Sequence, residues 1–401
     1  MRFNKILLGL LFFGFIAGSG LVLKNWPRWS AIAPEYLGAL AESILNPGLE
    51  IKNKNDIENQ SPLFQPPEII KAIYCTSWCA GSPSRVNYIV NLIKETELNA
   101  VVIDIKDYSG YVAYNIKNPD VEKYKAKEIR MPRINTLIKR LHDEGIYVIA
   151  RQTVFQDPVL AKARPDLAIK TSSGKLWLDN LKLAWLDPSS EEVWDYNIAI
   201  AKDALSRGFD EINFDYIRFP SDGNLRDIAF PFYDSAKPKA EVLVGFFAKL
   251  REETKGKVIS ADLFGLSAIN YDDLGIGQII ESAYLNFDFV CPMMYPSHYA
   301  AGFLGYPNPA KFPGEVVGYS VASAARRENI LRENQVEAKI GKLRPWLQDF
   351  NLGAKYDASM VRSEIDAAEM NGASGWLLWN ASNWYTKSAL KTEPPKTVDL
   401  N

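Results

Sequence analysis

Residues 187–220 read DPSSEEVWDYNIAIAKDALSRGFDEINFDYIRFP, and this stretch joins a helical pattern to a strand pattern. Asp187 precedes a run with helical periodicity at 189–207, which Gly208 ends. Residues 211–217 then alternate polar and apolar side chains, as strands do. The stretch therefore predicts one helix followed by one strand.

The same unit recurs along most of the chain. Apolar, β-branched runs alternate with polar loops and amphipathic helical patterns, which is typical of strand–helix units that build a parallel sheet. Eight strands are predicted, at 71–77, 100–106, 147–153, 211–217, 258–263, 287–293, 340–345 and 374–378. The clearest helices are predicted at 86–96, 132–145, 189–207 and 240–255. Eight units favour an α/β fold of the (β/α)8 TIM-barrel type over an open doubly wound sheet, because no Gly-rich phosphate turn follows the first strand.

The boundaries of this barrel follow from where the pattern starts and stops. We expect one barrel domain at 69–390 and a C-terminal tail at 391–401. The polar, Pro-containing stretch at 24–68 reads as a linker. The chain therefore carries one large domain rather than two or three smaller ones.

The first 23 residues predict export from the cytoplasm. Basic residues precede an uncharged apolar run at 6–23, and two Trp follow it. The run is long enough for a signal anchor in the membrane, and small residues at 17–19 leave a cleaved signal peptide as the alternative. We expect an extracytoplasmic protein that the N-terminus anchors in the membrane, or one that is secreted after cleavage.

Composition limits the chemistry that the chain can perform. The 401 residues include 46 Lys and Arg against 48 Asp and Glu, so no basic field exists to bind nucleic acid. Only 2 His and 3 Cys are present, and none form a cluster with metal-ligand spacing. We therefore expect no metal and no cofactor, and a metal-dependent deacetylase or other hydrolase is disfavoured. Carboxylates and aromatic rings are the abundant functional groups.

The cysteines predict packing rather than bridging. Three cysteines cannot form a complete disulfide framework. Cys75 and Cys79 lie too far apart along an extended chain to bridge if both belong to the strand. We expect them to be buried as small hydrophobic residues.

Carboxylates interrupt three of the predicted strands near their carboxyl ends, where TIM barrels place their active sites. Asp104 lies in an apolar run, so it either pairs with a cation such as Lys106 or faces a polar pocket. On the fourth strand, Glu211, Asn213 and Asp215 share one face and are expected to line the barrel interior. A satisfied hydrogen-bond network is the structural alternative for these residues.

Asp262 completes a possible pair of carboxylates. It ends the fifth strand, and Gly265 allows a close backbone approach beyond it. Asp215 and Asp262 on adjacent strands could then face each other across a pocket. Hydrolysis of a glycosidic bond needs such a pair, with one carboxyl protonated and the other ionised.

Aromatic and polar residues gather at the other strand exits and are typical of sugar-binding surfaces. An aromatic belt that closes the barrel is the structural alternative. The candidates for sugar binding on this rim are Trp78, Tyr295, His298, Trp379 and Asn380. Arg218 could hold a nearby carboxylate, and Trp177 and Trp185 are expected to extend the rim.

Six segments together resemble a known family. They are VVIDIKDYSGYVAYN (101–115), GIYVIARQTVFQDP (145–158), FDEINFDYIRFPSDG (209–223), ISADLFG (259–265), DFVCPMMYPSHY (288–299) and GASGWLLWNASNWYT (372–386). The chain resembles a bacterial glycoside hydrolase family, a TIM-barrel domain of unknown function that is distantly similar to the α-amylase and chitinase superfamilies. The resemblance covers roughly residues 69–385.

The resemblance implies roles for individual residues. Similarity to amylase-like barrels implies a nucleophile at Asp215 and a general acid on the fifth strand, where this chain has Asp262 in place of the usual Glu. Similarity to chitinase-like barrels implies an acid at the end of the fourth strand, a Tyr on the sixth and a Trp on the eighth. Tyr295 and Trp379 match that pattern, whereas Asp215 stands where Glu is usual.

These observations lead to one hypothesis and one rival. The hypothesis is a glycoside hydrolase that cleaves a polysaccharide or oligosaccharide of the cell envelope or extracellular space, with Asp215 and Asp262 as its catalytic pair. Asp104, Arg218 and the rim residues would position the sugar. The rival is a non-catalytic polysaccharide-binding barrel that uses the same carboxylates only for hydrogen bonds.

Overall fold

The structure is a computed structural model that describes residues 56–334 and 339–392. The segment expected to anchor the chain (1–23), most of the expected linker and residues 393–401 lie outside these described residues. Within the described residues, no helix combines the length and the apolar character needed to cross a membrane. The described residues from Ile57 onward belong to one compact unit.

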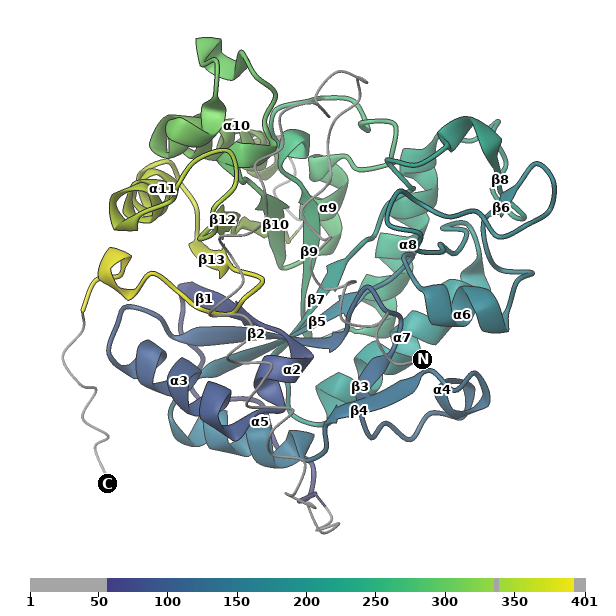
Figure 1. The fold of residues 1–401 in the computed structure, drawn as a ribbon, viewed down its shortest axis with the longest axis horizontal. Helices are drawn as coiled ribbons and strands as arrows, with labels where there is room; N and C mark the ends of the chain where they lie inside the picture. Colours follow the sequence, from purple (N-terminus) through teal and green to yellow (C-terminus); the bar gives the residue numbers. More distant parts are fainter. Residues whose placement is uncertain (1–55, 335–338, 393–401) are drawn as a thin grey trace, which may run out of the picture. The chain divides into compact units, whose positions relative to one another are not determined.

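Eight parallel strands close into a barrel, as predicted (Figure 1). The pairing runs in the order β1, β2, β5, β7, β9, β10, β12, β13 and returns to β1, which closes the ring. The strands are β1 (Ile70–Cys75), β2 (Ala100–Lys106), β5 (Tyr147–Thr153), β7 (Glu211–Asp215), β9 (Val258–Phe264), β10 (Phe289–Met293), β12 (Trp346–Gln348) and β13 (Gly375–Trp379). A closed ring of strands satisfies backbone hydrogen bonds on both sides of each strand.

One strand differs from its prediction. The seventh strand is predicted at 340–345, but the structure contains a short β11 (Lys342–Leu343) followed by β12 (Trp346–Gln348). Pro345 separates them because proline has no N–H group to donate to a neighbouring strand. The barrel strand therefore continues three residues past the predicted end and carries Trp346 into the ring.

Helices cover the outside of the barrel (Figure 1). The longer ones are α3 (Pro83–Lys94), α5 (Ile134–Asp143), α7 (Glu191–Ser206), α8 (Lys239–Glu253), α9 (Ile280–Asn286), α10 (Pro313–Asn334) and α11 (Ala358–Met370). α7 begins two residues after its predicted start, because Ser190 is the N-cap and its hydroxyl accepts the N–H of Val193 at 3.4 Å. Gly208 follows α7 with a φ of +106°, a conformation that favours glycine.

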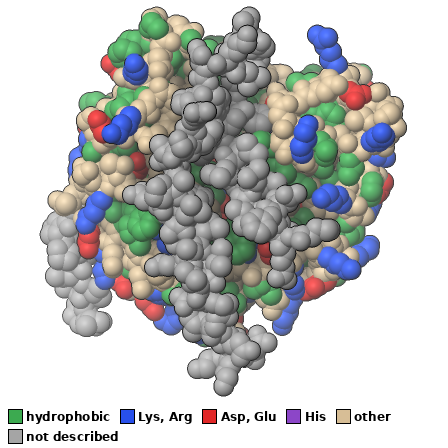
Figure 2. Space-filling model, viewed as in Figure 1, with side chains coloured by type: hydrophobic (Ala, Val, Ile, Leu, Met, Phe, Trp, Pro, Cys, Tyr) green, Lys and Arg blue, Asp and Glu red, His purple; other side chains and the backbone are tan. Residues whose placement is uncertain are grey.

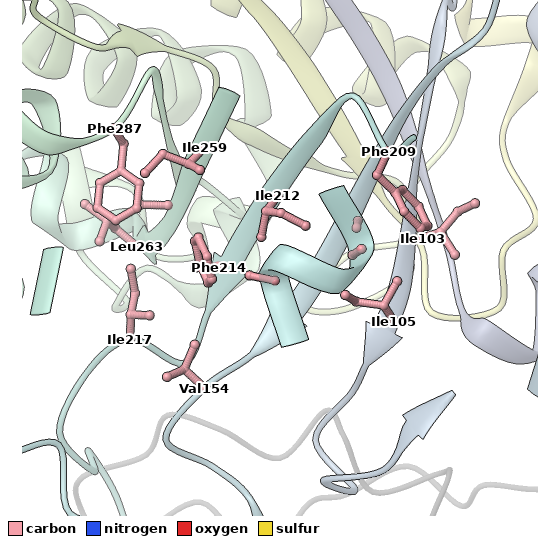
Figure 3. Close-up of a cluster of buried hydrophobic side chains, with 14 of the residues drawn as sticks. Ile103, Ile105, Val154, Phe209, Ile212, Phe214, Ile217, Ile259, Leu263 and Phe287 are labelled. Atoms are coloured by element: carbon pink, nitrogen blue, oxygen red, sulfur yellow. The ribbon is translucent and has the colours of Figure 1, made fainter. Parts of the chain in front are cut away.

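The barrel strands direct polar side chains inward and apolar side chains outward. On β7, Ile212 and Phe214 point away from the barrel interior and join a buried apolar cluster with Ile259, Leu263 and Phe287 (Figure 3). Ile103 and Ile105 on β2 belong to the same core. The alternating residues of both strands must then face the interior. The hydrophobic core of this fold thus lies between strands and helices, which leaves the inner face for polar groups.

Insertions enlarge the loops at the carboxyl ends of three strands. Short β3 (Val112–Tyr114) and β4 (Lys127–Met131) follow β2. The long loop after β5 contains α6 (Pro158–Ala163) and β6 (Lys170–Thr171), and β6 pairs with β8 (Ile228–Ala229) in the loop after β7. This pairing fastens two loops of the active-site end to each other.

The prediction for the first two cysteines is wrong in one respect. Both are buried, as expected, but they form a disulfide with their Cα atoms 5.6 Å apart. The chain leaves β1 at Cys75 and turns at once into the short α2 (Ser77–Ala80), which brings Cys79 back beside it. The prediction assumed that the chain stays extended from Cys75 to Cys79, whereas the chain turns into α2 between them. Cys291 is a free, buried cysteine.

Residues before the barrel pack against it. Backbone N–H groups of Gln60 and Leu63 donate to Arg207 O at 3.0 Å and Asp210 Oδ1 at 2.6 Å. On the described residues that are visible in Figure 2, both basic and acidic side chains occur. This distribution agrees with the near balance of charges in the sequence.

Candidate active site

One arginine and three aspartates meet inside the carboxyl end of the barrel. They are Arg151 on β5, Asp104 on β2, Asp215 on β7 and Asp262 on β9. Arg151 Nη1 donates to Asp104 Oδ1 at 2.6 Å, Nη2 donates to Asp215 Oδ2, and Nε lies 3.5 Å from Asp262 Oδ2. All four side chains are buried. One guanidinium group therefore connects all three carboxyl groups.

Strand register explains why Asp215 and Asp262 are neighbours. Asn213 on β7 pairs with Ser260 on β9, and Phe214 pairs with Ala261. The next position in this register places Asp215 beside Asp262. The sequence prediction that carboxylates on adjacent strands face a common space is therefore consistent with the observed pairing. Gly265 also lies where predicted, since a Cβ there would lie 2.3 Å from Met293 O.

Aromatic rings form one wall of the site. Tyr74 and Trp379 stack with ring centroids 3.9 Å apart, and Trp346 meets Trp379 edge-on at 5.5 Å. The Arg151 guanidinium lies 5.1 Å from the Trp379 ring centroid. Tyr74 also donates its hydroxyl to Asp104 Oδ2. This wall combines apolar ring faces with polar groups at its edge, as carbohydrate sites require.

Asp262 is arranged to hold a proton near neutral pH. Burial, followed by the negative charge of Asp215, raises the pKa of Asp262 from 3.8 to about 8. Its Oδ1 accepts two hydrogen bonds, from Asn213 Nδ2 at 2.8 Å and from Trp346 Nε1 at 2.7 Å. The proton therefore belongs on Oδ2, which faces Arg151 at a distance too long for a hydrogen bond.

Asp215 has the opposite environment. It accepts a charge-assisted hydrogen bond from Arg151 and a second one from the N–H of Tyr216 at 2.6 Å. Tyr216 has a φ of +54°, a conformation that is uncommon for a tyrosine and that costs about 1 kcal/mol or more. This turn aims the Tyr216 N–H at the carboxyl group, so Asp215 is held by two donors on different strands and loops of the site.

Asp104 is the third acidic group of the site. Burial is the main cause that raises its pKa from 3.8 to about 6, against the opposing effect of Arg151. The sequence left open whether Lys106 pairs with it. Arg151 is its partner instead. An irregularity of β2 between Asp104 and Lys106 brings Lys106 into register with Gln152, and Lys106 pairs with Asp157 at 2.9 Å.

A buried ionic layer lies beneath the site. Glu211 pairs with Arg344, and Ser260 donates to Glu211 Oε1 at 2.5 Å. Asn213 Nδ2 donates to Ser260 Oγ at 3.0 Å and to Asp262 at 2.8 Å. Glu211, Asn213 and Asp215 thus share the inward face of β7, as predicted. The layer ties the orientation of Asp262 to the barrel interior.

The predicted residues of the sixth strand exit lie close to the pair. Tyr295 is buried, and the negative charges of Asp262 and Asp215 add to the burial that raises its pKa well above its usual value. The His298 ring lies 5.3 Å from the Tyr295 ring, and its Nδ1 lies 3.0 Å from Ser297 Oγ. Burial lowers the pKa of His298 to about 4, so this ring is neutral at physiological pH.

Two predicted sugar-binding residues have different surroundings. Asn380 donates to the carbonyl oxygens of Asp349 and Trp384, so its amide already organises the loop after β13. Trp78 is 61% exposed on α2, with the Arg130 guanidinium 5.0 Å from its ring. Contact of either residue with a sugar stays a prediction.

Two tryptophans expected on the rim are buried instead. Trp177 and Trp185 are 1% and 0% exposed, so that expectation is wrong. Hydrogen bonds to Asn224 O and Asp179 satisfy their indole N–H groups, and the loop that carries them pairs with the loop after β7 through β6 and β8. Trp185 nevertheless contacts the predicted site residue Arg218, whose guanidinium lies 4.8 Å from its ring.

Sequence reasoning missed Arg151, Tyr74 and Trp346. Each lies on the inward face of its strand, so the alternation of inward and outward side chains along the strand was the signal that could have identified it. Arg151 interrupts the apolar start of β5 just as Asp104 interrupts β2, and the two residues pair directly in the strand register. Among the described residues, no group of three or more His, Cys, Asp or Glu is placed to hold a metal ion.

Comparisons with known proteins address the fold and the family. No curated protein matches the chain. A hypothetical protein from Ruminiclostridium thermocellum is 40% identical over 51% of this chain and 98% of its own, with a TM-score of 0.45.

Two glycoside-cleaving proteins resemble the chain in fold. The glycoside hydrolase domain of PgaB from Bordetella bronchiseptica is 15% identical, covers 81% of this chain and 100% of its own, and has a TM-score of 0.56. The α-L-fucosidase isoenzyme 2 of Paenibacillus thiaminolyticus is 12% identical, covers 80% and 48%, and has a TM-score of 0.53. The family model described as "Putative glycosyl hydrolase domain" (DUF4015) matches residues 72–385, and the chain therefore belongs to this family.

Proposed function

We propose that this member of the family hydrolyses O-glycosidic bonds in a cell-envelope or extracellular polysaccharide, with Asp262 as general acid and Asp215 as its ionised partner. The contrast between the two environments carries the proposal. Asp262 is buried, and its pKa is raised to about 8. Its Oδ1 accepts hydrogen bonds from two neutral donors, Asn213 and Trp346. Asp215 accepts from a guanidinium and a backbone N–H. A carboxyl group that retains its proton beside a second carboxyl group is the requirement for this reaction.

The reaction uses the two groups in turn. Asp262 gives its proton to the glycosidic oxygen as the bond to the anomeric carbon breaks, so the leaving sugar departs as a neutral alcohol. Asp215 meets the positive charge that develops at the anomeric carbon, either by attack or by activating water. Arg151 holds Asp215 in place and does not need to move during this step.

The strand register favours one stereochemical outcome. Neighbouring strands lie about 4.8 Å apart, and Asp215 and Asp262 occupy adjacent positions on β7 and β9. Retaining glycosidases separate their carboxyls by about 5 to 5.5 Å, whereas inverting enzymes need about 6.5 to 9.5 Å. Carboxyl groups that keep the spacing of their strands would fall near the first range, and on that basis we expect retention, with Asp215 as nucleophile.

The aromatic wall supplies a surface for the sugar. The exposed faces of stacked rings such as Trp379 bind the C–H faces of a pyranose, while Asp104 and Tyr295 offer hydrogen-bond partners. His298 and Trp78 lie farther along the same end of the barrel, after β10 and β1. In this proposal they contact sugar units beyond the cleaved bond.

Export and membrane anchoring are also part of the proposal. The Cys75–Cys79 disulfide supports an oxidising compartment, since such bonds persist mainly outside the cytoplasm. The apolar segment at 6–23 would provide the anchor, or a signal peptide that is cleaved. Fractionation of cells and mass spectrometry of the N-terminus would distinguish these two forms.

A glycan panel tests the proposed activity against the binding rival. The full chain is incubated with cell-wall and storage glycans, and new reducing ends are measured. Asp215→Asn should abolish release while glycan binding persists, and Asp272→Asn in the exposed loop after β9 is the matched control for charge. Binding without release by the wild-type chain would establish the non-catalytic rival instead.

A further inference from the structure

Arg218 occupies an aromatic enclosure at the exit of β7. Its guanidinium carbon lies 4.8 Å from the Trp185 ring centroid, 4.6 Å from that of Phe264 and 5.3 Å from that of Tyr216. Tyr216 follows Asp215, and Phe264 lies two residues after Asp262. The guanidinium therefore stands beside the proposed catalytic pair, between the exits of their two strands.

One edge of this guanidinium lacks a partner within the described residues. Nη1 donates to Phe219 O at 3.1 Å and to Ser221 Oγ at 3.2 Å. Nε and Nη2 donate to no described residue, and neither is among the polar atoms sealed from solvent. These two atoms form the edge that pairs side-on with a planar carboxylate through two parallel hydrogen bonds.

Three acids act on Arg218 through their charge, namely Asp215, Asp179 and Asp222, and each accepts hydrogen bonds from other groups. Asp222 Oδ1 accepts from the N–H of Asn180 at 3.0 Å. Asp215 binds Arg151 and the Tyr216 N–H. Asp179 accepts from Trp185 Nε1 at 2.9 Å and from Gln156 Nε2 at 2.8 Å. Among the described residues, no carboxylate lies within ion-pair distance of Arg218. Burial lowers the pKa of the Arg218 guanidinium, so the buried cation is destabilised until an anion joins it.

Negative charge near Arg218 comes from Asp215, Asp179 and Asp222, but the catalytic cluster itself carries little net charge. Asp262 is protonated at neutral pH, and Arg151 neutralises part of the charge of Asp104 and Asp215. Arg218 adds one further positive charge to this end of the barrel.

A surface hollow near the same end of the barrel is also lined by cationic side chains. It is an open hollow of about 380 Å³ between the loops after β2 and β5, and its only charged lining residues are Lys125 and Lys162. Neither lysine forms an ion pair within the described residues. The lining residues are Ser109, Tyr111, Tyr124, Lys125, Pro158, Val159, Lys162 and Ala163. Tyrosine rings beside free cations suit further units of an acidic saccharide chain.

We propose that the Nε–Nη2 edge of Arg218 binds an oxyanion of the substrate, so that the polysaccharide cleaved by this barrel is acidic, with a uronate carboxylate as the fitting group. The assignment of substrate class rests on the proposed function, whereas the anion site itself does not. Sulfate and phosphate esters share the same chemistry and are distinguished by the experiment.

The test observes Arg218 directly. Full-length chain labelled with 15N is titrated with sodium glucuronate, sulfate or inorganic phosphate, with glucose as the neutral control. Arg218→Lys identifies the Arg218 Nε–H signal by its loss. We expect glucuronate to shift this signal saturably and glucose to leave it unchanged. A tighter response to sulfate or phosphate would assign the anion to an ester, and no saturable shift with any of the three anions would overturn the proposal.

Variants separate this site from general charge effects. Arg218→Gln should weaken glucuronate binding about 10- to 100-fold, the effect of losing charge-assisted hydrogen bonds. Arg226→Gln removes the same charge from an exposed position eight residues away and should leave binding unchanged. An equal loss in both variants would show a diffuse charge effect and refute the site.

The two proposals can fail separately. Release of reducing ends from neutral glycans alone, dependent on Asp215 but not on Arg218, would refute the acidic substrate and leave the hydrolase standing. A saturable shift at Arg218 together with no release from any acidic or neutral glycan would refute the hydrolase and leave the anion site.

Discussion

Replacing Asp262 with Asn should make the folded protein more stable while it removes general-acid catalysis. The folded state holds a proton on Asp262 that the unfolded chain releases above its usual pKa of 3.8. Between about pH 4 and pH 8 the folded state binds more protons, so this residue makes stability fall as pH rises. Asn mimics the protonated acid and does not titrate, so the variant escapes this loss.

The size of the effect follows from the shift. About three pKa units separate 3.8 from pH 7, which is worth up to about 4 kcal/mol. Relaxation around a buried group reduces such values, so we expect about 2 to 4 kcal/mol at pH 7. The gain should vanish near pH 4 and reach its maximum near pH 8. Urea unfolding of both proteins at several pH values measures it.

Catalysis provides the second half of the same prediction. A sugar hydroxyl is a poor leaving group and needs the proton of Asp262, whereas a dinitrophenolate leaves without one. Asp262→Asn should reduce kcat on polysaccharide by about 10² to 10⁴-fold and should spare most activity on a dinitrophenyl glycoside. Asp215→Asn should lose activity on both substrates. Equal losses for Asp262→Asn on both substrates, or a stability gain that is independent of pH, would refute the assignment of the proton to Asp262.

Four further predictions follow from the same site and fold. The pH profile of kcat/KM should fall on its alkaline side near pH 8, where Asp262 loses its proton, and a plateau through pH 9.5 would contradict this role. Nuclear magnetic resonance of the first product should show a retained anomeric configuration, and an inverted product would exclude Asp215 as nucleophile. Arg151→Met should lower the unfolding free energy by about 3 to 5 kcal/mol at pH 7, because it leaves buried carboxylates unpaired, and a neutral effect would show that Arg151 is dispensable to folding. Replacing both Cys75 and Cys79 with Ser should cost about 2 kcal/mol under oxidising conditions, as expected for a short closed loop, and no cost at all would show that the bond does not constrain the chain.

The barrel was predictable because strand and helix patterns alternate so regularly. The bounds of β2 and β5 match their predictions, since each begins with an apolar run and lies between clear loop residues. The seventh strand was misplaced because Pro345 interrupts pairing within a strand that resumes after it. The alternation of side chains along β7 was also predictable from the sequence, and it placed Glu211, Asn213 and Asp215 inside the barrel.

The electrostatic centre of the site was harder to predict. Asp104 was singled out because a carboxylate in an apolar run is unusual, but Arg151 was not, although the same reasoning applies to it. Which cation joins which acid depends on strand register, and a sequence does not display register. The buried Trp177 and Trp185 were misjudged for a similar reason, since pairing between two distant loops decides their exposure.

Charge balance explains why the proton belongs on Asp262 rather than on another aspartate. Three buried carboxyl groups share one guanidinium, and like charges this close cannot all remain ionised. Asp104 and Asp215 accept direct hydrogen bonds from Arg151, whereas Asp262 is 3.5 Å from Nε and accepts only from neutral groups. The group with the weakest link to the cation retains the proton. It follows that Asp104→Asn, which frees Arg151 from one competitor, should lower the pKa of Asp262 and move the alkaline limb of activity to lower pH. Arg151 thus sets the acidity of a residue that it does not itself hydrogen-bond.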